Sequence, residues 1–207
     1  MREQTVGSWL DSLASGDPTP GGGAAAAMSL AVGAALVEMV CNLTIGKPRY
    51  ADHEPLMRRV QVEASDLRAR AVKLAEADAN AFAAVAAAYR LPKDDIADRA
   101  ARTEAIQAAL IGAVEVPLST AAAAAAIIDL TRRVVDGANV NVLSDVAVAA
   151  ASAAAALDAA AINVEINLAA MKDEERCDML RAELVEHVGA SAVAADVVAT
   201  VRTRVNA

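Results

Sequence analysis

Aromatic residues, cysteine and histidine are all scarce in this chain of 207 residues. Aromatic residues make up 2% of it, and it has two cysteines and two histidines. Cys41 and Cys177 lie far apart with no Cys-x-x-Cys pair, and His53 and His187 have no partners at ligand spacing. These absences argue against a disulfide scaffold and against a metal site. We therefore expect no bound metal and a reducing, cytoplasmic location.

Basic residues are the minority among the charged residues. The chain has 27 Asp and Glu against 19 Lys and Arg, which gives a formal net charge of −8. It also lacks an Arg-rich cluster and a series of aromatic residues that could stack on bases. Nucleic acid is therefore not an expected partner.

The longest uncharged run, residues 18–37, has 20 residues and reaches the length of a membrane span. It begins Pro-Thr-Pro-Gly-Gly-Gly and is otherwise mostly Ala and Gly, with few large apolar side chains. We interpret it as a loop followed by a tightly packed helix of a soluble protein, and we expect no membrane partner.

Alanine supplies 55 residues, about a quarter of the chain. Because alanine is the best helix former and a poor strand former, the composition predicts an all-α fold. No linker divides the chain, so we expect a single helical domain over residues 1–207, an up-and-down bundle of about six helices. Pro117 is expected to break or kink the fourth helix, which resumes at Ser119. The predicted helices cover residues 5–15, 21–44, 55–89, 94–135, 144–168 and 173–204.

The helix predicted over residues 55–89 has the length of the whole molecule. At roughly 1.5 Å per residue it measures about 50 Å, whereas a compact monomer of this size is about 43 Å across. Helices lined with alanine bury little area each, so long rods of this kind gain burial by pairing with another copy. We expect long antiparallel helices and a homodimer.

One carboxylate stands out on that long helix. Asp78 lies on a face that is otherwise apolar and carries the only Phe, Phe82, and one of the two Tyr, Tyr89. Burial raises the pKa of a carboxylic acid toward the range useful in general acid–base catalysis. A structural role, in which Asp78 is hydrogen-bonded across helices or solvated at a cleft, is the alternative.

Other polar groups are candidates for binding. Asp145, Ser152, Asn163 and Asn167 fall within about 60° of one another on the helix over 144–168, where they need partners, water or ligand. Gly21–Gly23 offers unhindered backbone N–H groups at a helix start, and this feature has little specificity. The cations available for an anionic ligand lie in loops: Lys47, Arg49 and Lys93.

Several short segments together resemble the cyclodeaminase/cyclohydrolase family of folate enzymes. The likeness covers nearly the whole chain, in order. The matching segments are 18–23, 39–47, 78–82, 89–93, 116–118, 139–145 and 163–168.

The resemblance implies an all-helical homodimer that binds a tetrahydrofolate derivative between helices, as its substrate and without a further cofactor. It implies that Asp78 is the catalytic residue; Glu76 stands where the family often has a second Asp. The residues to which it gives substrate-binding roles are Gly22, Gly23, Asn42, Lys47, Phe82, Lys93, Asp145 and Asn163.

Two reactions are implied by the resemblance. A methenyltetrahydrofolate cyclohydrolase adds water to 5,10-methenyltetrahydrofolate and gives 10-formyltetrahydrofolate. A formimidoyltetrahydrofolate cyclodeaminase converts 5-formiminotetrahydrofolate to the methenyl form with loss of ammonia. We favour the cyclohydrolase because residues 39–47 and 139–145 look most like stand-alone cyclohydrolases. A family member that binds folate without catalysis is a third alternative.

Overall fold

A computed structural model describes residues 4–206 as a bundle of α-helices, with no strand among these residues. The all-α prediction is therefore confirmed. Two short 3₁₀ helices, η1 (Pro48–His53) and η2 (Val140–Val142), lie in the connections. The α-helices are α1 (Val6–Leu13), α2 (Gly22–Thr44), α3 (Glu54–Tyr89), α4 (Ile96–Val134), α5 (Leu143–Ala169), α6 (Glu174–Val188) and α7 (Ala190–Val205).

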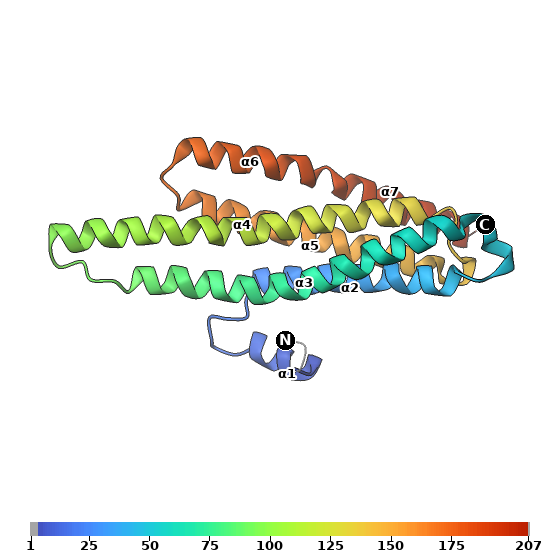
Figure 1. Cartoon of the computed structure of the whole chain (residues 1–207), viewed down its shortest axis with the longest axis horizontal. Coiled ribbons are helices and arrows are strands. Elements are labelled where there is room, and N and C mark those ends of the chain that lie inside the picture. The colour runs from blue at the N-terminus through green and yellow to red at the C-terminus, as the bar shows by residue number, and fades with distance from the viewer. Residues whose placement is uncertain (1–3, 207) are drawn as a thin grey trace.

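Four long helices form the body of the bundle (Figure 1). Both α3 and α5 pack against α2 and against α4, so the four helices close into an antiparallel, up-and-down arrangement. Helices α6 and α7 run back along α5 and α4, and α1 lies beside the bundle on the loop that precedes α2, with its Trp9 packed against the core. The hairpin of α3 and α4 extends past the start of α2, which leaves that end of the hairpin with fewer neighbours (Figure 1).

Small residues let the helix backbones approach closely. A Cβ atom at Gly33 of α2 would lie 3.1 Å from the backbone oxygen of Ala149 on α5, so α2 and α5 touch almost backbone to backbone here. Larger side chains fill the remaining space, and Leu30, Ile127 and Leu157 are fully buried. The alanine-rich composition therefore produces long helices that lie close together, with a densely packed core between them.

Pro117 does not interrupt α4, and the predicted break is wrong. The helix continues from Ile96 to Val134 with Pro117 buried inside it. A proline there removes one N–H, so the carbonyl of Ala113, four residues earlier, has no helical donor. The side-chain amide of Asn167 on α5 donates to that carbonyl at 2.7 Å. A neighbouring helix thus supplies the hydrogen bond that α4 cannot make for itself.

The single helix predicted over residues 173–204 is divided in two. Helix α6 ends at Val188 and α7 begins at Ala190, with Gly189 between them at helical angles of φ −59° and ψ −21°. The chain therefore keeps its direction, while the helix is interrupted at the residue with the weakest helix preference in this stretch.

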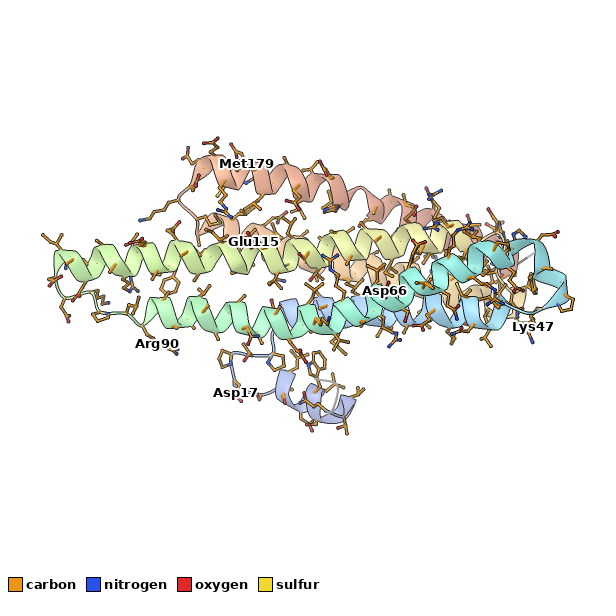
Figure 2. The ribbon with its side chains drawn as sticks, viewed as in Figure 1. Asp17, Lys47, Asp66, Arg90, Glu115 and Met179 are labelled. Atoms are coloured by element: carbon orange, nitrogen blue, oxygen red, sulfur yellow. The ribbon has the colours of Figure 1, made fainter. Side chains whose placement is uncertain are left out.

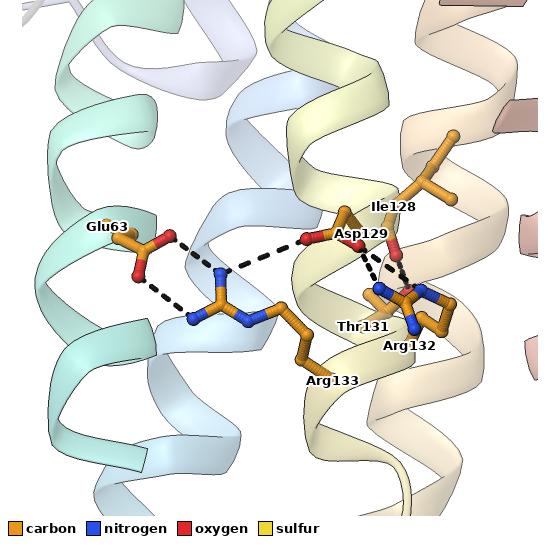
Figure 3. A network of polar contacts seen from close by, with 6 residues as sticks. All are labelled: Glu63, Ile128, Asp129, Thr131, Arg132 and Arg133. Carbon is orange, nitrogen blue, oxygen red and sulfur yellow. Dashed lines mark hydrogen bonds and ion pairs between the residues drawn. The ribbon is translucent and has the colours of Figure 1, made fainter. Parts of the chain in front are cut away.

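A cluster of ion pairs fixes α3 against α4 (Figure 3). Arg133 on α4 donates from Nη1 and Nη2 to the two carboxylate oxygens of Glu63 on α3, at 2.9 and 3.1 Å. Asp129, one turn earlier on α4, lies 3.9 Å from the same guanidinium. The hydrogen bond to Glu63 raises the pKa of Arg133. This bidentate contact is partly exposed, and it links α3 to α4, the two longest helices.

By length and composition alone, some helical stretches within residues 4–206 are suited to cross a membrane. They are α2, α4, Val140–Ala169 and Glu174–Val205. In the bundle, 56% of the most apolar window of α2, and the same share of α4, is buried inside the protein. The absence of a membrane partner stays a prediction.

Candidate functional site

A cleft of about 340 Å³ lies where α2 begins, beside the C-terminal third of α3. The loop before α2 forms one wall, and α3, α4 and α5 form the others. Its lining residues are Pro18, Thr19, Gly21, Gly22, Gly23, Asp78, Ala81, Phe82, Val85, Ala113, Asn163, Ile166 and Asn167. The cleft therefore gathers segments that are far apart in the sequence around one carboxylate.

Asp78 is half-buried in this cleft and faces the first turn of α2. Burial raises the pKa of its carboxyl group above the usual value, and a hydrogen bond from the backbone N–H of Ala24 partly opposes the rise. Gly21, the N-cap of α2, offers no capping side chain. The Asp78 carboxylate thus caps α2 from another helix, and it keeps a raised proton affinity at the edge of solvent.

Gly23 makes this approach possible. A Cβ atom at residue 23 would lie 1.9 Å from Oδ1 of Asp78, well inside van der Waals contact. At Gly22 the nearest atom to such a Cβ would be Nδ2 of Asn163, at 3.8 Å, which is an ordinary contact. Of the two glycines, Gly23 is therefore the one that the position of Asp78 requires.

Two asparagines of α5 form the opposite wall. Asn163 and Asn167 are one turn apart, and both are half-buried. The Nδ2 of Asn163 donates to the carbonyl of Ala159 at 2.8 Å, and that of Asn167 donates to the carbonyl of Ala113 at 2.7 Å. Both amides therefore have a defined orientation at the cleft.

The structure brings together five of the residues that the sequence had suggested for the site. Gly22, Gly23, Asp78, Phe82 and Asn163 all line the cleft. Asn167, which the sequence had placed on the same face as Asn163, joins them. Pro18 and Thr19 also line it and were missed, since nothing in a Pro-rich loop shows toward which helix it folds.

The remaining suggested residues do not line this cleft. They are Asn42, Lys47, Lys93 and Asp145. Lys47 borders a separate hollow of about 310 Å³ with Arg49, Tyr50 and Asn139, at the far end of α2. Because α2 has 23 residues, this end is about 33 Å from the cleft. Figure 2 shows Lys47 at one end of the bundle, where α2 turns toward α3.

Asn42 and Asn139 make structural contacts near that end. The side chain of Gln61 on α3 donates to Oδ1 of Asn42, which links α3 to α2. Asn139 donates from Nδ2 to the carbonyl of Leu43 at 2.9 Å, and its own Oδ1 accepts the backbone N–H of Asn141 at 3.1 Å. Asn139 is therefore a turn former that also ties the start of α5 to the end of α2.

The apolar face predicted on α3 is buried along only part of its length. Leu74 is buried, whereas Phe82 is 46% exposed and Tyr89 is 49% exposed. The face loses its cover because α2 begins at Gly22, beside Asp78, and does not extend along the last part of α3, residues 79–89. Phe82 thus forms the exposed rim of the cleft and is not a core residue.

The described residues contain no group of three or more His, Cys, Asp or Glu side chains that could hold a metal ion. Both cysteines are free and buried, and burial raises the pKa of Cys41 to about 12. A buried thiol with so high a pKa is a poor nucleophile. Among residues 4–206, Asp78 is the one residue with a carboxyl side chain that lines the cleft.

Known proteins are similar to this chain in sequence and in fold. The family model described as formiminotransferase-cyclodeaminase matches residues 5–186. The chain is 44% identical to the methenyltetrahydrofolate cyclohydrolase of Methylorubrum extorquens, with 98% of each chain covered. It is 37% identical to the formimidoyltransferase-cyclodeaminase of Rattus norvegicus over 75% of this chain and 29% of that protein.

A solved structure has the same fold. The crystal structure of formiminotetrahydrofolate cyclodeaminase from Thermotoga maritima superposes with a TM-score of 0.82 at 28% identity, over 98% of this chain and 96% of that one. The family resemblance found in the sequence is confirmed, and the chain belongs to the formiminotransferase-cyclodeaminase family.

Proposed function

We propose that this chain is a methenyltetrahydrofolate cyclohydrolase in which Asp78 acts as the general acid–base catalyst. The observation that carries the proposal is the half-buried Asp78 carboxylate, held at the glycine-lined start of α2 inside a 340 Å³ cleft. The likeness to the Methylorubrum extorquens cyclohydrolase over 98% of both chains supports the choice of reaction.

The proposed reaction needs a group that takes up a proton and gives it back. The Asp78 carboxylate accepts a proton from water as the water oxygen bonds to the cationic methenyl carbon of the substrate. The neutral tetrahedral intermediate then carries a hydroxyl group and keeps its bonds to N5 and N10. Protonated Asp78 returns its proton to N5 as the C–N5 bond breaks. The hydroxyl proton leaves to solvent, and 10-formyltetrahydrofolate and one H⁺ are the products.

The local environment of Asp78 supports this role. Its raised pKa makes the carboxylate a stronger base than a solvated aspartate, and the hydrogen bond from the backbone N–H of Ala24 opposes part of that rise by favouring the charged form. The negative charge also lies where the cationic carbon reacts, which favours binding of the methenyl form. In this scheme the folate is the substrate, and no cofactor takes part.

The substrate also carries an anionic glutamate tail, yet no Lys or Arg is among the residues that line the cleft. The loop cations Lys47 and Arg49 are about 33 Å away along α2 within one chain. The third, Lys93, lies in the loop between α3 and α4 and does not line the cleft either. A second copy removes this difficulty if the two α2 helices pair antiparallel, because the partner subunit's Lys47 then lies at the Asp78 end.

The surface of α2 supports such a homodimer. Ala25, Ser29, Val32, Leu36, Met39 and Leu43 are spaced 4, 3, 4, 3 and 4 residues apart and form one uncharged stripe. Val32 is 50% exposed and Leu43 is 42% exposed in the single chain. An unpaired apolar stripe of this length is typical of a helix that packs on another helix. A closed two-fold pairing centred on the stripe is the simplest arrangement.

The proposed function is tested by an absorbance assay with purified protein. 5,10-Methenyltetrahydrofolate is supplied in one reaction and 5-formiminotetrahydrofolate in a second. Loss of the methenyl absorbance at a rate proportional to enzyme concentration is the expected result. No turnover of either substrate would overturn the proposal and leave a folate-binding helical dimer as the alternative.

Cyclodeaminase activity is the second candidate. The similarity in fold to the Thermotoga maritima cyclodeaminase, with a TM-score of 0.82, favours it. Ring closure of 5-formiminotetrahydrofolate needs the same proton transfers at the same carbon, so one carboxylate could serve both reactions. A higher kcat/KM for 5-formiminotetrahydrofolate would assign this reaction instead. Since both cysteines are free thiols, we further propose that the protein works in the cytoplasm.

A further inference from the structure

The hydrogen bond between Asn167 and Ala113 does more than repair the helix at Pro117. Ala113 and Asn167 both line the Asp78 cleft, so the repaired carbonyl lies in the wall of the site. The nitrogen of the Asn167 amide is held by this carbonyl at 2.7 Å. Because only the NH₂ group of an amide can donate, the contact uses one of its two N–H groups and fixes which side of the Asn167 amide carries the acceptor Oδ1.

The acceptor left without a partner is Oδ1. Among residues 4–206, no donor reaches Oδ1 of Asn167 or Oδ1 of Asn163. Asn163 is fixed in the same sense, since its Nδ2 donates to the carbonyl of Ala159. One face of α5 therefore carries two cleft-lining asparagines, one helical turn apart, whose Oδ1 atoms are available as hydrogen-bond acceptors.

Such a wall suits a flat heterocycle that carries N–H donors. A reduced pterin has such donors in its lactam N–H, its exocyclic amino group and its ring amine. If the Asp78 carboxylate on the facing helix meets the reacting carbon, as proposed above, the α5 wall is left for the donor edge of a ring held between α3 and α5.

Resting on the function proposed above, we propose that Asn167 is a specificity-determining residue that accepts an N–H hydrogen bond from the pterin ring through Oδ1. Pro117 is the positioning residue that turns it. With any other residue at position 117, a backbone N–H would occupy the Ala113 carbonyl, and the Asn167 amide would lose its fixed orientation while keeping Oδ1 able to turn toward a bound ligand. The proline thus creates an unpaired carbonyl that selects one amide orientation in a binding site.

The test separates recognition from helix repair by using Pro117→Ala as the reference background. In that variant, residue 117 regains its N–H and satisfies the Ala113 carbonyl, so α4 no longer needs Asn167. Asn167→Ala and Asn167→Asp are each combined with Pro117→Ala. The values of kcat and KM for 5,10-methenyltetrahydrofolate are then measured, together with Tm and helical circular dichroism.

We expect Asn167→Ala to raise KM about 10-fold in the Pro117→Ala background, with kcat changed less than about 3-fold and Tm unchanged. Asn167→Asp keeps an oxygen acceptor at the same place, so its KM should stay within about 3-fold of the reference. Equal KM values for the reference and the Asn167→Ala double variant would overturn the proposal. A KM for the Asp variant as high as that for the Ala variant would overturn it too.

Calorimetric titration with tetrahydrofolate separates this inference from the reaction itself. If the wild-type chain turns over neither substrate but the dissociation constants follow the same order, the inference holds and the proposed reaction is wrong. If tetrahydrofolate binds neither to the wild-type chain nor to any of the variants, the inference is overturned as well.

Discussion

The α-carbon of Gly23 lies so close to the carboxylate of Asp78 that a Cβ atom there would stand 1.9 Å from Oδ1. The start of α2 and the C-terminal third of α3 therefore touch through a position that has room for a hydrogen atom only. The same contact lets the N–H of Ala24 donate to the carboxylate and holds it partly out of water. Most of the chemistry proposed for this protein depends on that approach.

Gly23→Ala is expected to displace the Asp78 side chain and to lower kcat/KM by about 100-fold or more, because a misplaced catalytic group loses its alignment. Steady-state kinetics with 5,10-methenyltetrahydrofolate measure the loss. Gly112→Ala in α4 is the matched control, since an added Cβ there meets no atom within 4 Å. Equal activity of the two variants would show that the close approach is not needed.

Asp78→Asn is expected to reduce kcat by about 100-fold or more while the helical circular dichroism spectrum is retained, because the amide cannot accept and return a proton. Asp66→Asn is the control on the same helix: Asp66 is exposed and does not line the cleft (Figure 2). Near-full activity of Asp78→Asn would remove Asp78 from the reaction.

The raised pKa of Asp78 also predicts a pH-dependent cost in stability. The folded state binds the Asp78 proton more tightly than the unfolded state does, since burial disfavours the charged form. The free energy of unfolding should therefore fall as pH rises from about 4, the usual value for Asp, through the raised pKa.

Asp78→Asn removes this titration. Urea unfolding at pH 4 and pH 7 should show the variant equal to wild type in acid and more stable than wild type at neutral pH. The stability difference, variant minus wild type, should be larger at pH 7 than at pH 4. A smaller difference at pH 7 would contradict the assigned direction of the pKa shift.

In the otherwise wild-type chain, Asn167→Ala should lower the free energy of unfolding by about 1–3 kcal/mol, because it leaves the buried Ala113 carbonyl without a donor. The Pro117→Ala substitution should suppress most of this loss by restoring a backbone N–H at residue 117. Urea denaturation of the wild type, the two single variants and the double variant gives the coupling energy between positions 117 and 167. An additive result, with no suppression, would mean that Asn167 does not repair α4.

Val32→Glu is expected to convert the proposed dimer to a monomer, because it places a charge at the centre of the uncharged stripe on α2. Sedimentation velocity measures the change. Val62→Glu is the control: Val62 is 60% exposed on α3, outside the stripe. If the antiparallel pairing is correct, the Val32→Glu monomer should also show a higher KM. A wild-type chain that sediments as a monomer would contradict the pairing.

Much of the secondary structure follows from local sequence. Pro-rich and Gly-rich segments end α1 and α2 where expected, and Asp95 and Asp173 cap α4 and α6 with hydrogen bonds to backbone N–H groups three residues later. These signals depend on neighbours within one turn, so a sequence contains all of the information that they need. The break at Gly189 and the continuity of α4 were not predicted. The first depends on the weak helix preference of one glycine, and the second on a hydrogen bond from another helix.

By itself, the sequence determined that the protein is helical, that its family is the formiminotransferase-cyclodeaminase family, and that Asp78 is a carboxylate on an otherwise apolar face. Only the tertiary structure decided which residues meet. It brought Gly23 to Asp78, turned Asn167 toward the carbonyl that Pro117 leaves unpaired, and kept Lys47 a whole helix away from the cleft. The physical reason is that helix formation is governed by contacts within a turn, whereas these meetings depend on how long helices pack across sequence separations of 50 residues or more.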